Sequence, residues 1–223
     1  MSSGELLSRS FNLYLSNLVI AAPMVVAVIV DAILFGLLSL FFFGFAFAGW
    51  PLHYAFHPYP LFAGFFLMIA LVSFLAFVVN TVAGGVVADM SWRIVEGRPY
   101  SLESSFNYIK QFAPQLIVAG IVAGIFILLL SLIPIVGTAV GMTLFAPLPL
   151  LIVRGRDVVD SLRRSVEIVI DSVSRRFEVP LASFIVFLLG VAGGRAFQLL
   201  VTLVGYPYIV LLYALYMREM GVY

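Results

Sequence analysis

The sequence predicts an all-α integral membrane protein with six transmembrane helices, three cytoplasmic interfacial amphipathic helices and a three-unit internal repeat. Three observations lead to this prediction: the composition, a set of long apolar runs, and a polar phrase that occurs twice. Of the 223 residues, 63% are hydrophobic and only 10% are charged, against roughly 45–50% and about 25% in soluble domains. Such a chain has too few polar side chains to cover itself in water.

Long apolar runs cover residues 18–47, 61–88, 115–132, 138–153 and the region from 180 onward. Most approach or exceed the ~18–20 residues that cross a bilayer core, and they are apolar on every face, unlike the strands of a transmembrane barrel. The last region predicts two helices, with a turn at Gly193–Gly194 and a kink at Pro207. A signal peptide ending near residue 48 is disfavoured, because its apolar stretch is about twice the usual length.

A polar phrase is repeated in this apolar chain. Residues 94–105 read IVEGRPYSLESS and residues 152–165 read IVRGRDVVDSLRRS. Both contain Ile-Val-x-Gly-Arg and then Ser-Leu-x-x-Ser. Glycine predicts a bend where the chain leaves the membrane, and Ser101 or the pair Asp160–Ser161 is expected to cap the following helix. The motif residues are Gly97, Ser101, Leu102, Ser105, Gly155, Ser161, Leu162 and Ser165.

Each copy of the phrase leads into a segment with helical periodicity, at 102–112 and at 158–177, and residues 6–15 (LLSRSFNLYL) form a third such segment. Pro23, Pro114 or Pro180 follows each segment near the start of an apolar run, where a helix tolerates proline. We therefore expect one membrane domain, 1–223, of three approximate units, 1–95, 96–153 and 154–223. Each unit has an interfacial helix, an outward span and an inward span.

Basic residues predict the orientation. Of the 12 Lys and Arg residues, all but Arg195 fall on one side of a six-crossing chain, and the positive-inside rule makes that side cytoplasmic. We expect a multi-pass protein of the cell (plasma) membrane with both termini in the cytoplasm.

A family resemblance supports the same architecture. The stretches VEGRPYSLESSFNYIKQFAPQLIVAGIVAGIFILL and PLPLLIVRGRDVVDSLRRSVEIV resemble a prokaryotic multi-pass family. It includes the YciC-like proteins and the membrane domain attached to some glycerophosphodiester phosphodiesterases. The resemblance covers roughly residues 88–189 and implies a six-helix membrane bundle. It carries over no catalytic residue, and we do not expect the phosphodiesterase activity, because the sequence contains no counterpart of its soluble barrel.

Two charged groups stand out within the apolar runs. Asp31 lies inside the first predicted span, where an ionisable group is costly unless it is paired or hydrated. We expect an intramembrane ion pair between Asp31 and Arg195; a substrate or ion pathway, or snorkelling of Arg195, are the alternatives. The spacing of Asp89 and Arg93 predicts an i,i+4 ion pair.

Several classes of function are disfavoured. The chain has no cysteine, which removes thiolate metal sites and disulfides. His53 and His57 are spaced like two metal ligands, but with Trp50, Tyr54 and Tyr59 beside them they favour an aromatic belt at the membrane interface. The net charge of +1 argues against nucleic-acid binding. We expect no cofactor, metal or catalytic residue.

These observations favour a non-enzymatic, membrane-organising or accessory protein. Its partners would be membrane lipids and a membrane protein or a second copy of the chain, engaged through the interfacial helices. The candidate headgroup contacts are Arg98, Arg154, Arg156, Arg163, Arg164, Arg175 and Arg176. The alternative is a small transporter or channel with a polar path near Asp31, Asn80 and Arg195.

Overall fold

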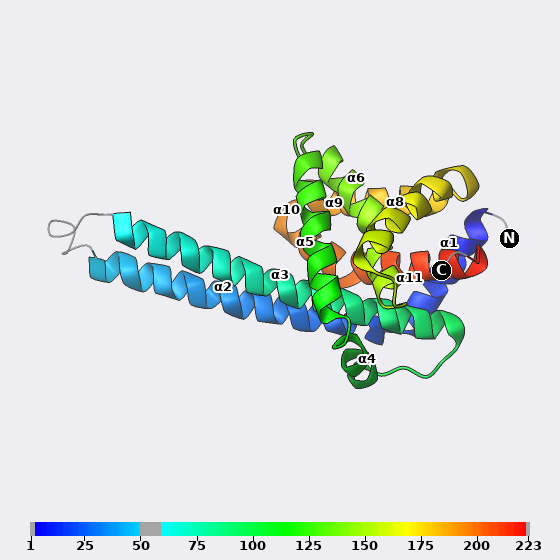
Figure 1. The fold of residues 1–223 in the computed structure, drawn as a ribbon, viewed down its shortest axis with the longest axis horizontal. Helices are drawn as coiled ribbons and strands as arrows, with labels where there is room; N and C mark the ends of the chain where they lie inside the picture. The colour runs from blue at the N-terminus through cyan, green and yellow to red at the C-terminus, as the bar shows by residue number, and fades with distance from the viewer. Residues whose placement is uncertain (1–2, 50–58, 222–223) are drawn as a thin grey trace.

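The computed structural model describes residues 3–49 and 59–221, and within these ranges every regular element is helical (Figure 1). In chain order the elements are α1 (Ser3–Ser16), the 3₁₀ turn η1 (Leu18–Ala21), α2 (Ala22–Gly49), α3 (Tyr59–Glu96), α4 (Leu102–Ile109), α5 (Ala113–Leu130), α6 (Val136–Phe145), α7 (Leu148–Ile152), α8 (Val158–Arg175), α9 (Glu178–Ala192), α10 (Gly194–Leu200), a π-helical turn (Val201–Gly205) and α11 (Tyr206–Glu219). The predicted all-α fold is therefore confirmed.

Four segments of the described residues could cross a membrane, by their length and composition. Leu18–Gly44, Phe66–Glu96, Ala113–Leu130 and Gly194–Glu219 are long and apolar enough to cross a bilayer. Two further apolar segments, Val136–Ile152 and Glu178–Ala192, are shorter. The chain therefore has the character of a membrane protein, with four segments of full spanning length where the sequence predicted six.

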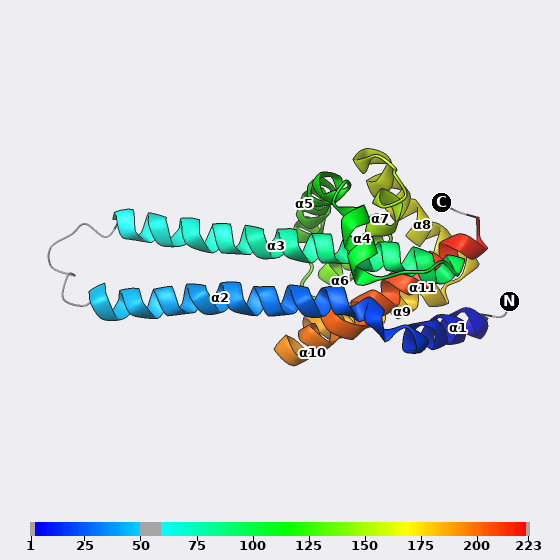
Figure 2. The same cartoon turned by 90° about the horizontal axis from the view of Figure 1, so that it is seen from below.

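The α2–α3 hairpin extends far from the remaining helices, and α5 crosses it at a steep angle (Figures 1 and 2). Glycines lie where α5 meets α3. A Cβ on Gly85 would lie 2.5 Å from Leu116 Cδ1, and one on Gly120 would lie 2.9 Å from Phe77 Cζ. Their missing side chains let the two helices approach closely. The first two hairpins are thus not parallel, as they would be in a simple six-helix bundle.

The core lies around the C-terminal half of α3, α7 and α11. Nearly all of α11 is buried, including the large side chains Tyr213 and Tyr216, and α3 packs against both α11 and α7. These are the ends of the helices that the sequence predicts to run inward. The most densely packed part of the molecule therefore lies at the predicted cytoplasmic end.

Prolines interrupt two of the apolar segments. The sequence predicted one helix over 138–153, but the chain breaks between α6 and α7 at Ala146 and Pro147, because proline lacks the N–H that would continue the helical hydrogen bonds. The irregularity expected at Pro207 is a π-helical turn directly before it, which accommodates the missing donor without ending the helix.

Three helices of 14, 8 and 18 residues, α1, α4 and α8, pack against the core from the sides, and we call them the short helices. α4 packs against α3, α8 packs against α6 and α7, and α1 packs against α11. Both α1 and the end of α11 lie opposite the free end of the α2–α3 hairpin (Figure 2). The segments with mixed polar and apolar faces thus gather around the ends of the helices that the sequence predicts to run inward.

Candidate functional site

The repeated phrase forms two chain corners of the same geometry. Gly97 and Gly155 have φ angles of +70° and +81°, which side chains disfavour and glycine tolerates. At each corner, the N–H of the residue after glycine donates to the carbonyl five residues earlier, at 2.8 Å in the first copy and 3.4 Å in the second. This is the Schellman helix end. The predicted bend is confirmed, and α11 also ends before a glycine of positive φ, Gly221 (+63°), which the sequence analysis missed.

The caps of the following helices agree with the prediction at one corner only. Ser101 caps α4, with its hydroxyl accepting from the Ser104 N–H and the Ser104 hydroxyl accepting from the Ser101 N–H. The cap of α8 is Asp157, whose carboxylate accepts from the Asp160 N–H at 2.9 Å. The expected Asp160–Ser161 cap was wrong, because the longer spacer lets the helix begin earlier.

Three serines of the phrase are buried, whereas the capping Ser101 is exposed. Ser105 and Ser165, and the aligned Ser10 in α1, are all 0% exposed. The Ser165 hydroxyl donates to the Leu144 carbonyl of α6 at 2.8 Å. Ser161 is also buried, and among the described residues the hydroxyls of Ser105 and Ser161 have no hydrogen-bond partner. These small side chains let α1, α4 and α8 approach the core closely.

The motif leucines lie further out than their serines. Leu102 in α4 is exposed and Leu162 in α8 is half-buried. Periodicity thus located the helices correctly, but it did not distinguish the face that packs on the protein from the apolar face that remains uncovered.

The expected ion pair between Asp31 and Arg195 was wrong. The Asn80 side-chain amide donates to Asp31 Oδ2 at 2.6 Å, across the α2–α3 hairpin. Arg195 is exposed at the start of α10, and within 3–49 and 59–221 no ion pair joins it to Asp31. The nearest chain neighbour of α2 is α3, so the carboxylate finds its partner there. Asp31 Oδ1 is buried and has no hydrogen-bond partner among the described residues.

Most of the candidate headgroup arginines pair with carboxylates of the same chain. Among the described residues the pairs are Arg98–Glu96, Arg154–Glu96, Arg156–Asp160, Arg163–Glu167, Arg164–Glu167 and Arg176–Glu178. Arg175, the remaining candidate, is exposed. These pairs partly neutralise the arginines, so their contact with lipid headgroups stays a prediction.

The Arg163–Glu167 pair on α8 shifts the pKa of both members. The Arg163 guanidinium donates to Glu167 at 2.7 Å, and Arg164 donates to the same carboxylate at 3.0 Å. The hydrogen bond from Arg163 is the main cause that lowers the pKa of Glu167, and the same bond raises the pKa of Arg163. Both groups are exposed, so solvent screens this interaction.

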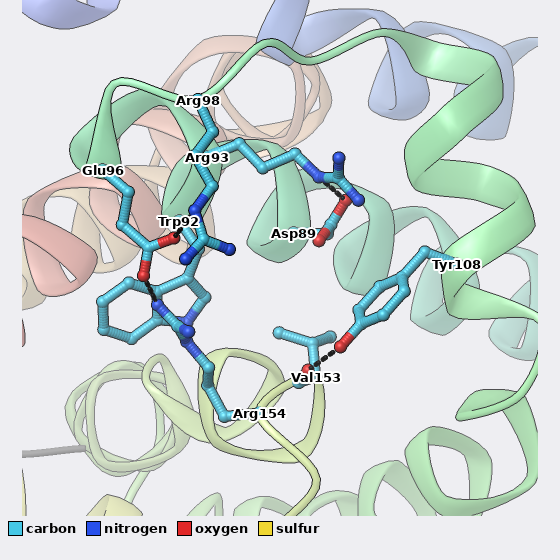
Figure 3. A pocket seen from close by; sticks show the side chains of 8 residues that line it. All are labelled: Asp89, Trp92, Arg93, Glu96, Arg98, Tyr108, Val153 and Arg154. Atoms are coloured by element: carbon cyan, nitrogen blue, oxygen red, sulfur yellow. Dashed lines mark hydrogen bonds and ion pairs between the residues drawn. The ribbon is translucent and has the colours of Figure 1, made fainter.

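The two copies of the phrase meet at a polar cavity of about 140 Å³ (Figure 3). We call it the corner pocket; it is lined by Asp89, Trp92, Arg93, Glu96, Arg98, Tyr108, Val153 and Arg154. Its residues come from the end of α3, the corner after it, α4, and the segment that follows α7. Asp89 is almost fully buried, whereas the side chain of Arg98 is 67% exposed. The pocket therefore has a buried floor and a rim in contact with solvent.

Hydrogen bonds, an ion pair and a cation–π contact hold the pocket walls together. The variable position of the phrase is Glu96 in the first copy and Arg154 in the second, and these two residues form an ion pair. Trp92 Nε1 donates to the Leu150 carbonyl at 3.0 Å, and the Arg154 guanidinium lies 4.2 Å from the centre of the Trp92 ring. The Tyr108 hydroxyl donates to the Val153 carbonyl at 3.1 Å.

Part of this pocket was predicted from the sequence. The Asp89–Arg93 ion pair is confirmed, with Arg93 Nε 2.7 Å from Asp89 Oδ2. Trp92 and Tyr108 were missed. The signal that could have found the pocket is the pair of opposite charges at one position of the phrase, because aligned positions in neighbouring repeat units often face each other.

The histidines His53 and His57, together with Trp50 and Tyr54, lie outside the described residues, so the proposed aromatic belt stays a prediction.

Comparison with protein families, with curated proteins and with solved structures finds no match to this chain. The resemblance to the YciC-like family therefore stays a prediction from the sequence.

Proposed function

We propose that this chain is a non-enzymatic, membrane-organising or accessory protein of the cell membrane, with both termini in the cytoplasm. It would engage lipid headgroups or a partner protein through α1, α4 and α8, which lie in the plane of the cytoplasmic leaflet. In this proposal the chain consists of three units that share one plan, and all six apolar segments enter the bilayer.

The packing order supports the three-unit plan. Each short helix packs against the inward helix of the preceding unit: α4 against α3, α8 against α6 and α7, and α1 against α11. The last of these contacts joins the first unit to the third and so closes a ring. Each inward helix also ends before a glycine of positive φ, namely Gly97, Gly155 and Gly221.

One observation carries the proposed role of the short helices: each buries one apolar face with its serine, yet leaves other large apolar side chains exposed. In α1, Phe11 is 52% exposed; in α4, Phe106 is 47% exposed; in α8, Val159 and Ile170 are 76% and 60% exposed. Charged side chains border these apolar surfaces. A helix with exposed apolar side chains beside charges is typical of helices that lie in the membrane interface or against a partner.

The lengths of the helices support insertion of more than one hairpin. α2 has 28 residues, which corresponds to about 42 Å, longer than a bilayer core of about 30 Å. A helix of excess length fits by tilting, and tilting the α2–α3 hairpin brings α5 closer to the membrane normal. Leu132 and Ile133, between α5 and α6, are 82% and 63% exposed, as expected for a hairpin tip that lies in lipid.

The transporter or channel alternative has weaker support. Asp31 and Asn80 lie together, but Arg195, the third residue of the proposed polar path, is exposed elsewhere. A single hydrogen-bonded pair between two helices is more typical of helix association than of a pathway.

The proposal can be tested by site-specific photo-crosslinking in native membranes. A diazirine amino acid at Ile170, an exposed position of α8, should form adducts with phospholipid if the helix organises lipid, or with a protein if it serves a partner. The matched control is Ile168, which is 1% exposed on the same helix and should crosslink only within the chain. If position 170 gave neither lipid nor protein adducts, the proposal would be overturned.

A further inference from the structure

The two corners share the same helix end at Gly97 and Gly155, but they differ in the side chains around it, and several of the positions that differ line the corner pocket. Aligning the phrases places Trp92 opposite Leu150, Arg93 opposite Leu151, and Asp89 opposite Pro147. Tyr108 corresponds in the same way to Ile168. At the second corner, Leu150, Leu151 and Ile168 are buried and apolar.

This difference separates the pocket from the task of building a corner. The second corner bends at Gly155 and starts α8 without a tryptophan, a buried carboxylate or a tyrosine at these positions. Even when they are paired, charged groups in a partly buried site often stabilise a fold no more than well-packed apolar residues would. A corner that needed only stability would therefore resemble the second one, so the polar lining of the first corner indicates a ligand.

The lining favours an anion. Three guanidinium groups, from Arg93, Arg98 and Arg154, face the two carboxylates of Asp89 and Glu96, which leaves the pocket with one positive charge. Guanidinium groups present about 15 N–H donors, more than the roughly eight acceptor sites of two carboxylates. The cavity of about 140 Å³ is several times the ~30 Å³ that one water takes up.

We propose that the corner pocket binds an anionic phosphate group, with Arg93, Arg98 and Arg154 as its ligands. A phosphodiester carries one negative charge, which balances the single positive charge of the lining. Arginine matches phosphate geometry through paired N–H groups. The Arg154 guanidinium lies over the Trp92 ring, which restricts the orientations that this ligand can adopt.

The neighbouring surface favours a membrane phospholipid as the source of the phosphate. α4 contributes Tyr108 to the pocket and exposes Leu102 and Phe106 elsewhere on the same short helix, so an acyl chain would find apolar side chains on the helix that carries part of the phosphate site. Lys110 lies 5.0 Å from the centre of the Phe106 ring and adds a cation directly after the same helix. This assignment of the source rests on the proposed membrane function, whereas the phosphate chemistry of the pocket does not.

The test uses the full-length protein, delipidated in a maltoside detergent. Three probes are compared by native mass spectrometry and by the shift of the melting temperature: dioctanoyl phosphatidylglycerol, inorganic phosphate, and octanoate, an anionic amphiphile without phosphate. We expect one phosphatidylglycerol to bind and octanoate not to bind. Binding of inorganic phosphate alone would support the pocket and assign it to a soluble phosphate compound.

Two variants and a matched control locate the binding. R98Q removes an exposed arginine of the rim, and R163Q removes an exposed arginine paired to a carboxylate on α8. R98Q should weaken phosphate-group binding by about tenfold or more, and R163Q should leave it unchanged. The double variant D89A/R93L keeps the net charge but makes the pocket resemble the second corner. This variant should abolish phosphate-group binding.

The proposal that the corner pocket binds phosphate would be overturned if R98Q and R163Q bound the probes equally well, or if the native protein bound no phosphate probe. That result would leave the proposed function standing if Ile170 still crosslinks to lipid or protein. If D89A/R93L did not fold, R98Q would still decide, because its exposed side chain contributes little to the core.

Discussion

Replacing the glycine at a corner by alanine tests the geometry of the repeated phrase. Gly97 has a φ of +70°, and a Cβ placed on it would meet no atom within 4 Å. The whole decrease in the free energy of unfolding of G97A therefore comes from backbone strain. For an L-residue in the left-handed region this strain is about 1–2 kcal/mol. For a chain of this size, about 1 kcal/mol corresponds to a decrease in melting temperature of about 2–4 °C. G155A should behave in the same way, since its φ is +81° with equally open surroundings.

The assay is thermal unfolding in detergent at a fixed scan rate. The control is G124A in α5, which also has open space around a Cβ but an ordinary helical backbone; it should match or exceed the native stability, because alanine favours helix over glycine by about 1 kcal/mol. G97N should fall between G97A and the native protein, because asparagine tolerates this region better. If G97A were as stable as G124A, the left-handed corner would be refuted.

Three further predictions concern single side chains. D31N keeps an oxygen that can accept from Asn80, so the free energy of unfolding should change by less than about 1 kcal/mol; a loss of several kcal/mol would reveal a buried cation instead. S165V removes a buried hydrogen bond to α6 and should cost about 1–3 kcal/mol in chemical denaturation, whereas S174V, at an exposed position, should stay within about 0.5 kcal/mol. The pKa of Glu167 is lowered by its hydrogen bond from Arg163, so the Arg163–Glu167 pair stabilises the folded state at pH values above the usual carboxyl pKa near 4.3. This stabilisation is lost as the pH falls through the lowered pKa. An NMR titration of Glu167 with an ordinary midpoint would contradict this prediction.

The sequence was most informative where structure depends on local chemistry. Apolar runs located the long helices, because hydrophobic length needs no knowledge of neighbours, although α3 continues to Glu96, beyond the predicted end at 88. Glycine at Gly97 and Gly155 predicted the corners, since few other residues adopt a positive φ. The i,i+4 spacing of Asp89 and Arg93 predicted their ion pair, because helix geometry alone brings them together.

Features that depend on the mutual rotation and crossing of helices could not be predicted in this way. Asp31 was assigned to Arg195 because both lie in apolar surroundings, yet its hydrogen bond goes to Asn80 on the adjacent helix. The steep crossing of α5 over α3 depends on the close approach at Gly85 and Gly120. Glycine in a membrane helix indicates a contact, but it does not give the angle of that contact.

The candidate site shows the same limit. Charges at the variable position of the phrase, Glu96 and Arg154, were visible in the sequence, but their pairing requires the ends of α3 and α7 to lie side by side. Ser105 and Ser165 were recognised in the sequence only as residues that recur in the phrase, and recurrence does not indicate burial. Their burial follows from the close packing of α4 and α8 on the core, which periodicity alone cannot reveal.

Cysteine accessibility tests the central claim most directly, namely that the corners and their short helices lie together on the cytoplasmic side of a membrane. The native chain has no cysteine, so single cysteines can be placed at Ser104 in α4 and Ser174 in α8, both exposed, and at His57 between α2 and α3. A membrane-impermeant maleimide should label positions 104 and 174 only after the cells are opened, and position 57 in intact cells. Labelling of positions 57 and 104 from the same side would contradict the account.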